Sequence, residues 1–248
     1  MLLSTFQFIV TALLAIACAR SFSLSEGEVP LLALMIPALW LLPKAKVSGF
    51  ALLGAMGVFA LTLPDQPVTL SVVVWSVFPL LMVMFSARSN TVVVVVSSMV
   101  VMTLWIGVMA TQANGKLEGS ALLSLIQLFC VVVAWWSSRH WQPTQNRRWW
   151  ALLLLLPLWV SQWYYAVILA LSITVMFAVM ELLSRAKSEQ VDWGSLMCWT
   201  LPTVAFASLM VIPDTEVPDP VFVIWLCLLA TAWMTDYLIS EDEESDEY

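Results

Sequence analysis

The chain has 248 residues, of which 61% are hydrophobic and only 11% are charged. Because soluble proteins carry roughly 25% charged residues, this composition excludes a soluble globular domain, a disordered chain and a secreted disulfide scaffold. The net charge of −7 is concentrated near the C-terminal end, where six acids lie between Glu241 and Glu247. We therefore expect an all-α integral membrane protein, with a transmembrane bundle over residues 1–240 and an acidic, disordered cytoplasmic tail over residues 241–248.

Apolar runs bounded by charged or turn residues predict about ten transmembrane helices, at roughly 20 residues per helix. In chain order, the predicted spans cover residues 2–19, 29–43, 47–63, 68–87, 91–111, 120–137, 148–161, 163–183, 195–212 and 220–239. Within the apolar stretch 148–183, Ser161 and Gln162 are followed by three aromatic residues. Amphipathic aromatics prefer the membrane interface, so this pattern predicts a tight hairpin. Small residues along the third span predict close packing against its neighbours.

Lysine and arginine residues determine the predicted orientation. With a cytoplasmic N-terminus, eight of the ten basic residues fall on the cytoplasmic side, and only Arg20 and Lys116 fall outside. Positive charge accumulates in the cytoplasmic loops of membrane proteins, so both termini are predicted to be cytoplasmic. Short loops and this charge asymmetry are typical of a multi-pass protein of a bacterial inner membrane.

Four prolines lie inside predicted spans, in the second, fourth, seventh and ninth: Pro37, Pro79, Pro157 and Pro202. Division of the bundle into possible halves of five spans, residues 1–115 and 116–240, pairs the first proline with the third and the second with the fourth. Halves with an odd number of spans have inverted topology, which is typical of transporters with a site near the membrane midplane. Alternatively, the four prolines pair by chance, because proline is common in membrane helices.

This layout is similar to that of the drug/metabolite transporter superfamily. The resemblance covers the ten short helices, the two inverted halves and the cytoplasmic position of both termini. It concerns the layout alone and is not carried by a sequence motif. It implies a transporter and leaves the substrate open.

Gln7 and Gln127 are the best polar candidates for a substrate-facing site. The spans hold amides and hydroxyls but almost no ionisable group at depth, and an unpaired amide is costly in hydrocarbon. Most of the hydroxyls are expected to form hydrogen bonds between helices or to their own helix. A pathway formed by these two amides and the four span prolines would suit an uncharged or lipid-linked solute.

Glu181 and Asp236 are the acids closest to the interiors of their spans. Glu181 precedes Arg185 by four residues, so an interfacial ion pair explains it, and Asp236 lies near the solvated tail. Alternatively, either acid forms a proton site. The cysteines lie in apolar runs without metal-ligand or disulfide spacing, so we expect buried thiols, no metal and no cofactor: Cys18, Cys130, Cys198 and Cys227.

A group of arginine and tryptophan residues flanks the sixth and seventh predicted spans: Arg139, Trp141, Arg147, Arg148 and Trp149. Such residues anchor helices at an anionic headgroup layer, so membrane lipids are the expected contact. Recognition of a phosphorylated lipid or polyprenyl headgroup is the alternative. A weaker hypothesis combines three of these arginines with His140 in a lipid- or glycan-modifying enzyme.

Two functions are consistent with these features, and neither is enzymatic. The first is a small transporter or flippase for an uncharged or lipid-linked solute. The second is a non-catalytic membrane subunit or scaffold of an envelope complex, in which the tail from Glu241 to Glu247 contacts a protein partner. The tail is otherwise a solvated end that adds charge. Because the loops are too short to form a domain, no nucleic-acid partner is expected.

Overall fold

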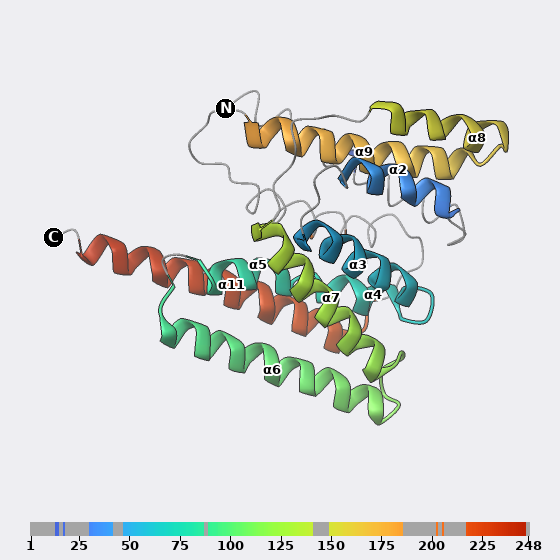
Figure 1. The fold of residues 1–248 in the computed structure, drawn as a ribbon. Helices are drawn as coiled ribbons and strands as arrows, with labels where there is room; N and C mark the ends of the chain where they lie inside the picture. Colours follow the sequence, from blue (N-terminus) through green and yellow to red (C-terminus); the bar gives the residue numbers. More distant parts are fainter. Residues whose placement is uncertain are drawn as a thin grey trace. The chain divides into compact units, whose positions relative to one another are not determined.

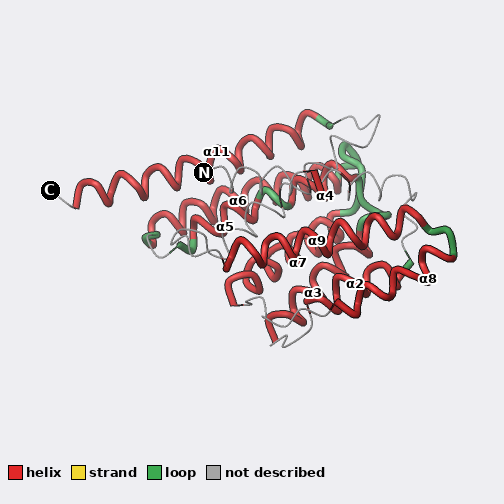
Figure 2. Tube along the Cα trace, turned by 90° about the horizontal axis from the view of Figure 1, so that it is seen from above, coloured by secondary structure: helices red, strands yellow, loops and turns green. Residues whose placement is uncertain are grey.

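The computed structural model describes residues 13–14, 17, 30–41, 47–86, 89–140, 149–185, 202, 205 and 217–246. In this part of the chain all regular structure is helical, with no strand, which confirms the predicted all-α class (Figures 1 and 2). Two of its helices, α6 (Thr91–Ala113) and α7 (Ala121–His140), are long and apolar enough to cross a membrane.

Contacts divide the chain into two compact units. The first unit comprises residues 1–54 and 136–215, and the second comprises residues 55–135 and 216–248. Helix α3 (Val47–Thr62) and helix α7 each have residues in both units. The predicted halves, residues 1–115 and 116–240, are based on a possible internal symmetry of the sequence. Units defined by contacts do not test them, and they stay a prediction.

Four helical segments lie wholly within the first unit: α2 (Leu31–Leu41), the 3-10 helix η1 (Trp149–Leu154), α8 (Leu155–Val160) and α9 (Tyr164–Arg185). Helix α2 packs along α9 and also contacts η1 and α8, and Figure 1 shows α8 and α9 side by side. Their shared core contains Ile36 of α2, Leu158 of α8 and a face of α9 that includes Ala166 and Ala170. Small residues on that face allow α2 to approach closely.

The hairpin predicted within residues 148–183 is confirmed by the reversal between α8 and α9. The Trp163 N–H donates to the Leu158 carbonyl at 3.1 Å, and the Gln162 N–H donates to the Trp159 carbonyl at 3.0 Å. These two bonds are the Schellman pattern that ends a helix. Gln162 occupies its left-handed position with φ 61°, where glycine is the usual residue.

The described part of the second unit contains the C-terminal part of α3, then α4 (Val68–Val74), α5 (Val77–Met84), α6, most of α7, and α11 (Asp219–Asp246). Helix α11 packs against α4, α5 and α6, and α5 also contacts α6. The predicted close approach along the third span is wrong at Gly54 and Gly57, because both are exposed and a Cβ at either would meet no atom within 4 Å. The buried face of α3 in this unit includes Ala55 and Phe59.

The predicted fourth span is interrupted between α4 and α5, just before Pro79. Proline has no N–H to donate, and the Trp75 carbonyl instead accepts from the Phe78 N–H at 3.1 Å. The Ser76 N–H and hydroxyl both donate to the Val73 carbonyl, at 3.0 and 2.6 Å. The interruption is therefore a tight 3-10 turn whose polar groups have partners although its residues are buried.

The other span prolines behave differently from one another. The change from η1 to α8 occurs at Leu155, two residues before Pro157, which is exposed. Pro37 is buried inside the continuous helix α2, and Pro202 is a buried helical residue. An interrupted helix thus accompanies Pro79, a direct change from 3-10 to α-helix precedes Pro157, and the short helix α2 accommodates its proline.

The C-terminal helix is longer than predicted. The predicted span ends at residue 239, and α11 continues through Asp246, whereas the predicted disorder of the tail stays a prediction. No glycine or proline follows Pro220 within α11, and glutamate is a good helix former. The acids oppose the helix dipole at this end, but the uninterrupted run of helix-compatible residues extends the helix beyond the predicted span.

Candidate functional site

Helix α7 buries polar residues together with apolar ones such as Val131 and Ala134, and it exposes further apolar residues. Its buried face includes Ser124, Gln127 and Ser137, at helical spacing. Its outer face includes Leu125 and Phe129, and the Phe129 side chain is 64% exposed. In a water-soluble protein the outer face of such a helix is mainly polar.

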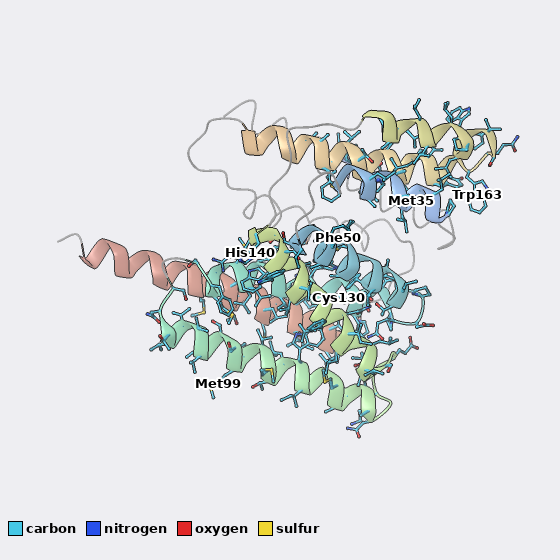
Figure 3. All side chains as sticks on the ribbon, viewed as in Figure 1. Met35, Phe50, Met99, Cys130, His140 and Trp163 are labelled. Atoms are coloured by element: carbon cyan, nitrogen blue, oxygen red, sulfur yellow. The ribbon has the colours of Figure 1, made fainter. Side chains whose placement is uncertain are left out.

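Helix α6 shows the same distribution. Ser97 and Gln112 are buried, whereas Val95, Met99 and Ile106 are exposed. Figure 3 shows Met99 projecting from α6 away from the other helices of its unit. The apolar outer faces of α6 and α7 are thus suited to an apolar surrounding, and two of their buried polar side chains, Ser124 and Gln112, bond to each other.

One polar group lies at the two loops that follow α3 and α6, and we call it the loop cluster: the buried side chains of Gln66, Gln112 and Ser124 with the backbone N–H of the exposed Ser120. The Gln66 Nε2 donates to the Ser124 hydroxyl at 2.7 Å, and this hydroxyl donates to the Gln112 Oε1 at 2.9 Å. The Ser120 N–H donates to the Gln66 Oε1 at 3.1 Å, and the Gln112 Nε2 donates to the Glu118 carbonyl at 3.4 Å. Each amide in the loop cluster therefore uses both its oxygen and its nitrogen.

Gly119 allows the α6–α7 loop to approach Gln66. Its φ is +93°, a backbone conformation that side chains disfavour. A Cβ at this position would lie 2.7 Å from the Gln66 Oε1 and 2.9 Å from the Pro67 Cδ. The loop cluster thus depends on the absence of a side chain at Gly119.

A second group, the Gln127 cluster, joins three helices: it consists of Gln127 of α7, Thr62 of α3 and Ser71 of α4. The Gln127 Nε2 donates to the Ser71 hydroxyl at 2.9 Å and to the Thr62 hydroxyl at 3.2 Å. Gln127 is 0% exposed, and its Oε1 has no hydrogen-bond partner. An unpaired buried acceptor costs about 1–3 kcal/mol. The Gln127 cluster thus contains an unsatisfied acceptor, whereas both amides of the loop cluster have partners for their oxygen and nitrogen.

Several span hydroxyls of the described residues bond to their own helices, as predicted. Thr103, Ser172, Thr174 and Thr231 each donate to the carbonyl four residues earlier, at 2.7–2.8 Å. These groups are satisfied locally, and they leave Gln127 as the predicted polar residue that reaches across helices.

The predicted interface residues are described only in part. Arg139 and His140 end α7 and are exposed, and the His140 Nδ1 lies 2.8 Å from the Trp136 carbonyl. The ring centroids of His140 and Trp136 are 4.9 Å apart. Four predicted residues lie outside the described part of the chain: Gln7, Trp141, Arg147 and Arg148. Three others have a helical backbone in η1, α9 and α11, and their side chains lie outside the described part: Trp149, Glu181 and Asp236.

The predicted burial of the thiols is correct for Cys130 and wrong for Cys227. Cys130 is buried on α7, three residues after Gln127, and is labelled in Figure 3. Cys227 is exposed on α11, because an apolar run does not distinguish the face toward the bundle from the outer face. Cys18 and Cys198 lie outside the described residues.

Sequence reasoning missed the loop cluster. Gln66, Gln112 and Ser124 each lie within about one turn of a predicted span end, where polar residues are ordinary. The short segment Pro64–Pro67, which holds Gln66 between two prolines, was the available signal.

Comparisons with known protein families, with curated proteins and with solved structures find no match to this chain.

Proposed function

We propose that this protein is a small carrier, a transporter or flippase, that moves an uncharged or lipid-linked solute across a bacterial inner membrane. In this proposal the chain crosses the membrane about ten times, with both termini in the cytoplasm. The observation that carries the proposal is the Gln127 cluster, in which a wholly buried amide keeps an unpaired oxygen. The apolar outer faces of α6 and α7 support a lipid surrounding.

Contacts between equivalent spans support the two inverted halves. The second and seventh predicted spans correspond to α2 and to η1 with α8, and these segments pack together. The fifth and tenth predicted spans correspond to α6 and α11, which also pack together. In a two-fold arrangement, equivalent elements meet at the axis. Each contact, taken within its own unit, thus joins spans that the proposed halves pair.

The interrupted fourth span supports a carrier as well. Transporters commonly place their sites where a helix is discontinuous. Here Ser71, a member of the Gln127 cluster, lies in α4, and Trp75 at the interruption follows it by four residues. The nitrogen of the Gln127 amide is thus bonded to a helix that is interrupted one turn after Ser71.

Topology is tested by labelling single cysteines in intact cells with a membrane-impermeant maleimide, in a chain whose native cysteines are replaced. We expect labelling at positions 65, 118 and 162, which are exposed and predicted to be external. Asn90, exposed and predicted to be cytoplasmic, serves as the matched control and is labelled only after permeabilisation. Absence of external labelling at position 162 would refute the ten-span topology.

Transport is tested with the purified full chain in proteoliposomes. One assay follows erythritol entry by light scattering, and another follows flipping of a fluorescent phosphatidylethanolamine by dithionite quenching. Either rate should exceed that of protein-free vesicles. If both rates equal the background, the carrier proposal is wrong.

The second candidate is a non-catalytic membrane subunit, and the exposed outer face of α6 favours it. A face containing Val95, Met99 and Ile106 could pack against an apolar helix of a partner protein as well as against lipid chains. Copurification from native membranes separates the two candidates. A stoichiometric protein partner, together with no solute or lipid flux, would establish the subunit role.

A further inference from the structure

We propose that the Gln127 Oε1 is the hydrogen-bond acceptor of a binding site for a neutral solute that carries a hydroxyl or amide N–H donor. This inference rests on the proposed carrier function and assigns its substrate class. It is carried by the arrangement of the Gln127 cluster, in which every other group of the amide is already used.

The hydroxyl of Thr62 determines which way the Gln127 amide faces. It donates its only proton to the Phe59 carbonyl at 2.7 Å, so toward Gln127 its oxygen can only accept. The nitrogen of Gln127 must therefore face Thr62 and Ser71, as the 3.2 and 2.9 Å distances show. Both amide protons are consumed there, and both lone pairs of the Oε1 remain for a donor.

Other buried groups of the second unit do not present the same chemistry. In the described chain, the Trp105 Nε1 also lacks a partner, but it is a single donor on an otherwise apolar ring. The Gln127 Oε1 is instead an acceptor beside two hydroxyl groups that hold the amide in place. Such prior fixing of a polar group reduces the entropy cost of binding.

The neighbours of Gln127 favour a neutral donor over a cation. Thr62 and Ser71 are uncharged, whereas Asp65 and Glu118, the acids of the adjoining loops, are exposed. A cation moved away from water needs a paired charge, and the Gln127 cluster supplies only neutral oxygens. A polyol hydroxyl or a primary amide meets these requirements.

The loop cluster closes the site on the side of the α3–α4 and α6–α7 loops. Ser124, which accepts from Gln66, precedes Gln127 by three residues on α7, about 4.5 Å along a helix axis. A solute that reaches Gln127 from these loops must first separate Gln66 from Ser120 and Ser124. The loop cluster is therefore the barrier at that end of the site.

The site is tested by thermal unfolding of the full chain in lipid nanodiscs, followed by tryptophan fluorescence. Each donor probe is paired with a methylated form that keeps its skeleton but cannot donate: erythritol with 1,2,3,4-tetramethoxybutane, and butyramide with N,N-dimethylbutyramide. At a tenfold excess over Kd, a bound probe raises the midpoint on the order of 3 °C. We expect this saturable rise with both donors and not with the methylated forms.

Variants assign the rise to Gln127. Gln127→Met keeps the length of the side chain and removes the oxygen, so it should abolish the rise. Gln127→Asn shortens the side chain by one methylene and so moves the amide oxygen back. It should reduce the rise in the midpoint, and it replaces Gln127→Met in the test if that variant does not fold. Thr174→Val is the control, because the Thr174 hydroxyl bonds only to its own helix, and it should keep the full rise.

The outcomes separate the site from the carrier function. Equal rises with methylated probes, no rise with either donor, or a rise that survives Gln127→Met would overturn the site. Erythritol flux that continues unchanged in Gln127→Met would also overturn it, while leaving the carrier proposal intact. Binding that depends on Gln127, without flux of any tested solute or lipid, would support the site and overturn the carrier proposal.

Discussion

Replacement of Gln127 and of Gln66 by methionine should have different effects on stability, although both amides are buried, at 0% and 4% exposure. Methionine is close to glutamine in shape and adapts to its surroundings. In Gln66→Met, two hydrogen bonds are lost, one to Ser124 and one from Ser120. At about 1 kcal/mol per bond, this variant should lose about 2 kcal/mol.

Gln127→Met also loses two hydrogen bonds, to Thr62 and Ser71. It removes an unpaired buried acceptor at the same time, which relieves about 1–3 kcal/mol. The two effects oppose each other, so the net change should be close to zero. The free energy of unfolding is measured for both variants by titration with SDS in mixed micelles, without added solute. Equal destabilisation of the two variants would mean that the Gln127 Oε1 has a donor in the native protein.

Three further changes test the loops and the helix ends, each by the same unfolding measurement. Gly119→Ala combines a positive φ with a 2.7 Å approach to the Gln66 Oε1 and should cost about 1–3 kcal/mol; an unchanged stability would show that the loop adapts freely. Gln162→Gly should stabilise by up to about 1 kcal/mol, because φ is 61° there, and a loss of stability would contradict the Schellman geometry. Asn90→Ala removes the cap on the Val93 N–H, bonded at 2.9 Å, and should cost about 1 kcal/mol, whereas Asn90→Ser should cost less.

The features that follow from local chemistry could be predicted from the sequence. A lone amide in an apolar run must find partners inside the bundle, and Gln127 bonds to Thr62 and Ser71 of two other helices. The reversal at Gln162 followed from polar and aromatic residues in the middle of an apolar stretch too long for one span. The interruption near Pro79 follows from the missing N–H of proline.

Features that depend on distant contacts could not be predicted. Gln66 and Ser124 are separated by 58 residues, and neither has a neighbour in sequence that indicates the other. Cys227 and Gly57 lie in apolar, small-residue patterns, yet both are exposed. In a membrane helix both faces are apolar, so composition alone does not show which face packs against the bundle.

The two polar clusters have complementary energetic roles in a carrier. Opening of the loop cluster breaks three contacts that involve the side chains of Gln66 and Ser124. At about 1 kcal/mol each, the open form would have a population of about 1%. In the proposed carrier, a solute that reaches Gln127 from these loops would be bound only after this opening, and it would stabilise the site through the oxygen that lacks a partner. The free-energy cost of opening thus depends on the hydrogen-bonded groups of the loop cluster, whereas the free energy gained on binding depends on the unpaired Gln127 Oε1. A substitution in one cluster should therefore change one of these two free energies and leave the other unchanged.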